Sequence, residues 1–207
     1  MNKQNRLLLV KAHHELEQLL KEEDSITKIR NHKDFDYLVE IILHRQAFQD
    51  VAKEVGLFDY SKNHDLDKIA CSITLGKAET RMLHKQIAAH HKSIEKVQSN
   101  IFILEEKVID YECSGRTKID APQTAFEYIT SNGNELEKKL LMPIVKRFGL
   151  ENNQNHHPLT KVEYQKMVNN LSDEVILNEL KKAYHYLKGV IVYEKINDFV
   201  NQNNLDL

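Results

Sequence analysis

The chain has 207 residues, of which 41% are hydrophobic and 29% charged, so it is long enough to bury one sizeable core and does not have the composition of a disordered protein. Its 29 lysines and arginines stand against 31 acidic residues, and the net charge of −2 excludes a protein that attracts nucleic acid or an anionic membrane through its overall charge. No apolar run reaches the roughly 18 residues that a membrane span needs, and the run from Leu7 to Val10 is too short for a signal sequence, so we expect a cytoplasmic protein.

Six glycines and three prolines interrupt a chain whose apolar residues recur every three or four positions, which predicts an all-α fold. The first half is expected to contain a helix from about Lys3 to Glu23 and a second from about Asp34 to Val55 that ends at Gly56 in a left-handed cap. The remaining elements of this half are a polar loop at Asp59–Asn63, a helix from His64 to near Gly76, helical pieces over 77–100, and a helix from Ile101 to Cys113 that Gly115 breaks.

Beyond Gly115 the pattern predicts a helix start near Pro122, a turn at Ser131–Asn134 and a helix from Glu135 to Arg147 that Gly149 closes. A polar loop at Glu151–Pro158 contains His156 and His157, which we interpret as surface histidines. Thr160 and Glu163 have capping-box spacing and open the first of two C-terminal helices, and the tail is expected to fray from Asn201. We expect a helical core over residues 1–118 and a C-terminal helical extension over 119–207.

Several histidines and carboxylates stand at positions where they can meet. His44 shares an apolar stripe with Ile41 and Phe48, although a single histidine in such a stripe is more often hydrogen-bonded to a carbonyl than bound to a metal. Two cysteines, Cys71 and Cys113, lack metal-binding spacing and are expected to be reduced thiols in the core.

Two further stretches concentrate ligand-type side chains. His84, His90 and His91 lie within eight positions, and one of the adjacent pair should point inward, although spacing does not decide which. Glu106 and Asp110 are four apart and therefore project from one face of a helix, where they repel unless they are solvated or a cation lies nearby.

In chain order these residues read His44, then the doublet His64-Asp65 with Lys68 three positions later, then His84 with His90-His91, then Glu106 and Asp110. This order over residues 36 to 115 resembles the HD-domain superfamily of metal-dependent phosphohydrolases, and within it an uncharacterised HD-like branch found in phages and bacteria. The resemblance implies an HD-like helical bundle with additional C-terminal helices.

The resemblance also implies roles for individual residues. His44, His64, Asp65 and Asp110 would hold one ion, and Asp65 would bridge to a second ion bound by His84 and either His90 or His91. Lys68 would contact a substrate phosphate, and Glu106 would support the ligands or position water. Arg45 is a further candidate for the substrate phosphate, although basic residues are more often solvated. The sequence departs from the branch at three positions on the substrate side: Asp67, Ala88 and Tyr111.

Mixed histidine and aspartate ligation suits manganese, iron, cobalt, nickel or zinc, with one or two ions per chain. We therefore expect a metal-dependent phosphohydrolase that acts on a small nucleotide, such as a nucleoside monophosphate. A helical HD-like protein without catalysis, regulatory or phage-encoded, is the alternative, and a metal-stabilised structural protein is a third. The expected partner is a small phosphorylated substrate, with no nucleic-acid or membrane partner, and the sequence leaves an oligomer open.

Overall fold

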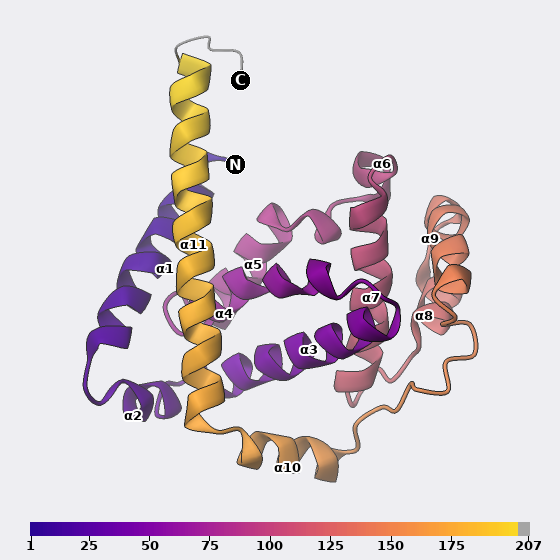
Figure 1. Ribbon diagram of the computed structural model, residues 1–207, viewed down its shortest axis with the longest axis horizontal. Coiled ribbons are helices and arrows are strands. Elements are labelled where there is room, and N and C mark those ends of the chain that lie inside the picture. Colours follow the sequence, from indigo (N-terminus) through magenta and orange to yellow (C-terminus); the bar gives the residue numbers. More distant parts are fainter. Residues whose placement is uncertain (203–207) are drawn as a thin grey trace. The chain divides into compact units, whose positions relative to one another are not determined.

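A computed structural model describes residues 1–202, with side chains described at all of them except 60, 61 and 196–202. Every regular element in this part of the chain is a helix, which confirms the predicted all-α class (Figure 1). Within the same residues, no helix combines the length and the hydropathy that crossing a bilayer requires.

The chain forms two compact units, and each is assembled from separate stretches of sequence. The first unit contains residues 1–41, 65–87 and the residues from 172 onward, and the second unit contains residues 42–64 and 88–171. Residues on both sides of position 118 thus belong to the second unit. The expected division into residues 1–118 and 119–207 stays a prediction.

The first unit brings together the first and last helices of the chain. α1 (Lys3–Lys21) and α11 (Asp173–Gln202) lie side by side (Figure 1), and α11 also contacts α4 (Leu66–Ser72). The buried residues of α1 and α11 recur every three or four positions, as expected for helices that each bury one face. The apolar ones are Leu9, Ala12, Leu16, Ile176, Leu180, Ala183, Leu187 and Ile191, and the polar residues Asn5 and Glu179 are buried as well. The unit also contains α2 (Ser25–Arg30), α5 (Lys77–Ile87) and the start of α3 (Phe35–Glu54).

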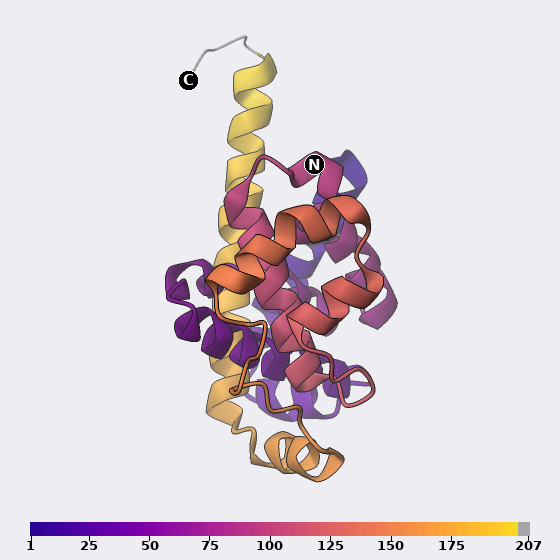
Figure 2. The same cartoon turned by 90° about the vertical axis from the view of Figure 1, so that its right-hand side faces the viewer.

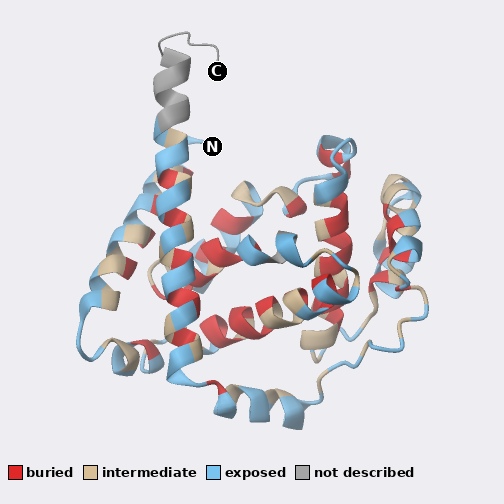
Figure 3. Ribbon diagram, viewed as in Figure 1, coloured by how far each residue is buried: buried red, intermediate tan, exposed pale blue. Residues whose placement is uncertain are grey.

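The second unit is organised around α7 (Ile101–Thr117), which contacts α8 (Ala125–Asn132) and α9 (Glu135–Arg147), as Figure 2 shows. Figure 3 shows α7 buried along much of its length, whereas α10 (Lys161–Asn170) has no buried residue. The core between α6, α7, α8 and α9 consists of Ile94, Val97, Leu104, Val108, Ala125, Ile129, Leu141, Ile144, Val145 and Leu150. The remaining elements are the end of α3, two 3₁₀ turns, η1 (Phe58–Asn63) and η2 (Ala89–His91), and α6 (Ile94–Val97).

Most helix ends follow local sequence signals. The predicted capping box at Thr160 and Glu163 is present: the Thr160 hydroxyl accepts from the Glu163 N–H, and Glu163 accepts from the Thr160 N–H. Gly56 and Gly149 adopt φ of 77° and 70°, so both expected glycine caps have the left-handed backbone that glycine favours.

The predicted break at Gly115 is wrong, because α7 continues to Thr117. A Cβ at Gly115 would lie 1.8 Å from the Gln123 carbonyl oxygen, so the glycine permits a close approach of the segment that follows the helix. The predicted helix start near Pro122 is also displaced: α8 begins at Ala125 behind a Thr124 cap.

Smaller differences occur in the first half of the chain. The first helix ends at Lys21, and the separate helix α2 follows it. The expected loop at Asp59–Asn63 forms the 3₁₀ turn η1, and the helix after the His64-Asp65 doublet begins at Leu66 and ends at Ser72. The expected fraying from Asn201 falls mainly on residues 203–207, which lie outside the described residues.

Candidate metal centre

In the second unit, His64 lies between two carboxylates of α7. Glu106 Oε1 is 2.9 Å from His64 Nδ1, and Asp110 Oδ1 is 3.4 Å from His64 Nε2. The four-residue spacing places both carboxylates on one side of the helix, as expected. The Phe48 ring stacks on the imidazole with centroids 3.7 Å apart, and the His64 side chain has no exposed surface. The imidazole is therefore fixed on both edges and on one face.

Two more histidines contact the same carboxylates. His44 Nε2 is 3.0 Å from Asp110 Oδ1, and His90 Nδ1 is 3.0 Å from Glu106 Oε1. One ligand atom each from His64, His90 and Asp110 lies within 4.8 Å of the other two. Four chain segments of the second unit thus supply the cluster: α3, the residue after η1, η2 and α7.

The histidines keep both carboxylates ionised. Burial would raise the pKa of Glu106, but hydrogen bonds with His64 and His90 lower it to about 2. Burial acts in the same direction on Asp110, and His44 and His64 hold its pKa well below the ordinary value. The cluster therefore presents two carboxylate anions in a buried environment at neutral pH.

The donor set fits a divalent transition metal. Glu106 accepts from Nδ1 of His64 when that nitrogen carries the proton, which leaves Nε2 beside Asp110 as the ligand atom, an arrangement that is common around metal-binding histidines. Ligand atoms about 2.1 Å from an ion lie roughly 3.0–3.4 Å from one another. The separations of 3.0 Å and 3.4 Å from Asp110 Oδ1 to Nε2 of His44 and His64 agree with that spacing.

The first unit contains a second buried group with the same construction. His84 Nδ1 is 2.7 Å from Asp67 Oδ2, and His84 Nε2 is 3.1 Å from Asp65 Oδ1. One ligand atom from each of the three residues lies within 4.8 Å of the other two. The Lys68 ammonium donates to Asp65 Oδ2 at 2.7 Å, so Asp65 is held from both oxygens.

Two local features mark this group as unusual. Burial would lower the pKa of His84, but Asp67 and Asp65 raise it above the ordinary value. Asp65 has φ of 57°, the left-handed region that residues other than glycine seldom adopt, and it is the only such residue in the described part of the chain. The residue that follows His64 is thus held in a strained conformation by its surroundings.

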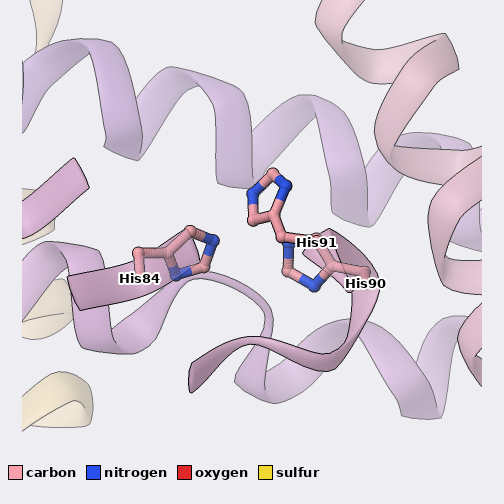
Figure 4. Close-up of side chains that lie close together, drawn as sticks. All are labelled: His84, His90 and His91. Carbon is pink, nitrogen blue, oxygen red and sulfur yellow. The ribbon is translucent and has the colours of Figure 1, made fainter. Parts of the chain in front are cut away.

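The adjacent histidines differ in burial. Figure 4 shows His90 and His91 on η2 and His84 on α5. His90 is 5% exposed whereas His91 is exposed, so the inward-pointing member of the pair is His90. The roles that the resemblance implies for these three residues stay predictions.

Arg45 is also more buried than expected. It is 2% exposed, and its guanidinium donates to the carbonyl of Lys62 at 3.3 Å. A basic residue with this burial is not a solvated surface group. Its contact with a substrate phosphate stays a prediction.

Sequence reasoning missed several contributors. Asp67, which departs from the pattern of the branch that the sequence resembles, orients His84. The interpretation of His156 as a surface histidine is wrong, because its imidazole lies 2.8 Å from the carboxylate of the fully buried Glu112. Neither pairing has a sequence signal, since the partners are 17 and 44 positions apart.

No protein-family model, curated protein or solved structure matches the chain. The protein is therefore characterised by its own contacts: an all-helical chain with buried histidine and aspartate groups that are compatible with a metal site.

Proposed function

We propose that the protein is a metal-dependent phosphohydrolase, and that His44, His64, His90 and Asp110 hold its divalent ion. The observation that carries the proposal is the fixed orientation of His64, with one nitrogen on Glu106 and the other beside Asp110. The order of these residues in the sequence, which resembles the HD-domain superfamily, supports a small nucleotide as substrate, with a nucleoside monophosphate as the first candidate.

Three imidazoles and one carboxylate favour manganese, iron, cobalt, nickel or zinc over magnesium. The group formed by Asp65, Asp67 and His84 has the residue types for a second ion, so the proposal allows one or two ions per chain. Of the two adjacent histidines, His91 is the less favoured ligand because it is exposed.

When bound, the ion supplies positive charge that acidifies a water molecule and neutralises phosphoryl oxygens. The residues of the chain orient the ligands and bind the substrate. Glu106 holds the imidazoles of His64 and His90 in the orientation that ligation needs. The resemblance assigns Lys68 to the substrate phosphate; its ammonium is fixed by the hydrogen bond to Asp65, and 18% of its side-chain surface is exposed.

The metal is tested first. The purified full-length protein should contain one or two equivalents of a transition metal by elemental analysis, and Asp110→Ala and Asp65→Ala should each lower that content. His157→Ala, which removes an exposed loop histidine, is the matched control and should leave the content unchanged. Protein that is free of metal, and that gains no thermal stability when manganese or zinc is added, would refute the metal centre.

Catalysis is tested second, with phosphomonoesters, cyclic nucleotides and nucleoside triphosphates in the presence of manganese. Turnover of one class that His64→Ala abolishes and His157→Ala preserves is the expected result. Bound metal without turnover of any class would favour the alternative, a helical binding or regulatory protein.

A further inference from the structure

Cys113 is a thiol that lies beside the candidate metal cluster of the second unit. It is free and buried on α7, three residues after Asp110, so the two side chains share one side of that helix. Its Sγ is 3.6 Å from His44 Nε2 and 3.7 Å from His44 Nδ1. One ligand atom each from His44, Asp110 and Cys113 lies within 4.8 Å of the other two. The thiol therefore belongs to the ligand-type side chains of this unit, although its spacing in the sequence gives no metal-binding motif.

The distances within this group of three fit a single ion. In a tetrahedral zinc site, with bonds of about 2.3 Å to sulfur and about 2.1 Å to nitrogen, the sulfur and nitrogen atoms lie about 3.6 Å apart. The distance of 3.6 Å from Cys113 Sγ to His44 Nε2 agrees with that spacing. Asp110 Oδ1 lies 3.0 Å from the same nitrogen, so the nitrogen faces a sulfur and a carboxylate oxygen together.

The surroundings of Cys113 allow an ion to reach it and to be held there. The cysteine has no exposed surface, but the side chains of His44 and Asp110 keep 12% and 13% of theirs, so solvent reaches two members of the group. Cys113 also packs in an apolar cluster with Phe48, Val51, Ala52 and Ile109. The attraction between a thiolate and a cation is stronger in such an apolar environment than in water.

Without an ion, the thiol has the ordinary contact of a buried cysteine in a helix. While it carries its proton, it donates to the Asp110 carbonyl oxygen at 3.3 Å. A metal ion that binds the sulfur displaces this proton, because a coordinating thiol is deprotonated. The same side chain can thus be a core thiol in the metal-free protein and a ligand in the metal-bound protein.

We infer that Cys113 is a thiolate ligand of the ion proposed above, next to His44 and Asp110. When the ion binds, the thiol releases its proton to solvent and the sulfur forms a bond to the metal. This inference rests on the proposed function and deepens it, because a thiolate narrows the class of metal. Sulfur ligands favour zinc, whereas manganese is suited by oxygen ligands, so the site should bind zinc more tightly than manganese.

The experiment uses cobalt as the probe, added to the full-length protein after a chelator has removed bound metal. Cobalt bound to a thiolate has an intense sulfur-to-metal charge-transfer band in the near ultraviolet, which cobalt bound only to nitrogen and oxygen lacks. The unsubstituted protein should show this band, and Cys113→Ala and Cys113→Ser should both lose it. Cys71→Ala is the matched control, since it removes the other cysteine, which is also buried and free, and it should keep the band at full intensity.

Metal affinity provides a second readout. In a competition titration with a chromophoric chelator, the zinc affinity of Cys113→Ala should fall by more than the roughly 10- to 100-fold that the loss of an outer partner costs. Its manganese affinity should stay nearly unchanged, because manganese gains little from sulfur. An equal fall for both metals would indicate that the cysteine only packs the site, and it would overturn the inference.

The cobalt spectrum of the unsubstituted protein needs no variant that folds. Bound cobalt without the charge-transfer band, or a band that Cys71→Ala removes, would overturn the inference and leave the proposed function standing. A band that depends on Cys113, in a protein that turns over no phosphate ester with zinc, cobalt or manganese, would refute the proposed function and leave the thiolate ligand.

Discussion

The buried carboxylate of Glu112 is predicted to stabilise the second unit through its negative charge. Its side chain has no exposed surface and accepts hydrogen bonds from the Ala125 backbone N–H at 2.8 Å, the Asn153 amide at 2.7 Å and the His156 imidazole at 2.8 Å. Glu112→Gln keeps the shape but places an NH₂ group against one of these donors. A buried donor that loses its acceptor costs about 1–3 kcal/mol, and the loss of charge weakens the remaining bonds, so we expect a destabilisation of about 3 kcal/mol.

For a chain of this length, 3 kcal/mol corresponds to a fall in melting temperature of about 6–12 °C. Urea unfolding followed by circular dichroism, together with a thermal melt, measures both quantities. Hydrogen exchange should also become faster in the loop at 151–158, because Asn153 and His156 tie that loop to α7.

The control is Glu95→Gln, which makes the same chemical change at an exposed position of α6 and should alter the stability by less than about 0.5 kcal/mol. If Glu112→Gln unfolds as the control does, the charge at this position contributes nothing and the reasoning is refuted.

Three further outcomes are expected. Burial would lower the pKa of His156, but Glu112 raises it above the ordinary value, so the stability that His156 contributes is present below its unfolded pKa of about 6.5 and is lost as the pH rises through the higher folded value. The free energy of unfolding of His156→Gln should therefore differ more from that of the unsubstituted protein at pH 6 than at pH 9. Equal differences at the two pH values would contradict this. Gly115→Ala should destabilise the protein by about 2 kcal/mol or more, because the new Cβ would lie 1.8 Å from a backbone oxygen. Gly189→Ala in α11, where a Cβ would have nothing within 4 Å, should stabilise it by about 0.5–1 kcal/mol, and urea unfolding of both variants measures these opposite changes. Glu106→Gln should weaken metal binding by about 10- to 100-fold without abolishing it, because it orients ligands and is not proposed as one; complete loss in a metal titration would make it a direct ligand.

Local signals accounted for most of the helices. The capping box at Thr160 predicted the start of α10, and the bounds expected for the helix from Glu135 to Arg147 agree with α9. Thr124 and Glu127 carry the same four-residue signal, and this capping box, not Pro122, determines where α8 begins. The break predicted at Gly115 failed for another reason: tertiary packing requires the glycine there, and the helix continues through it.

The candidate site was predictable only in part. Helical spacing showed that Glu106 and Asp110 share a face, but it could not show that His64 lies between them, since the partners are more than 40 positions apart in the chain. It also could not identify Asp67 as the partner of His84. Such pairings depend on how distant helices pack, which a single sequence does not encode in its periodicity.

The two units are completed at different times during synthesis of the chain. All residues of the second unit have been made once the ribosome passes position 171, whereas the first unit still lacks α11, which contacts both α1 and α4. The hydrogen bond from the Tyr184 hydroxyl to Glu17 joins residues that are 167 positions apart in the sequence. Because α11 covers the apolar face of α1, that face stays exposed until translation is almost finished. We therefore expect the ligand-type residues of the second unit to become ordered on the nascent chain first, and those of the first unit only after the last helix has emerged.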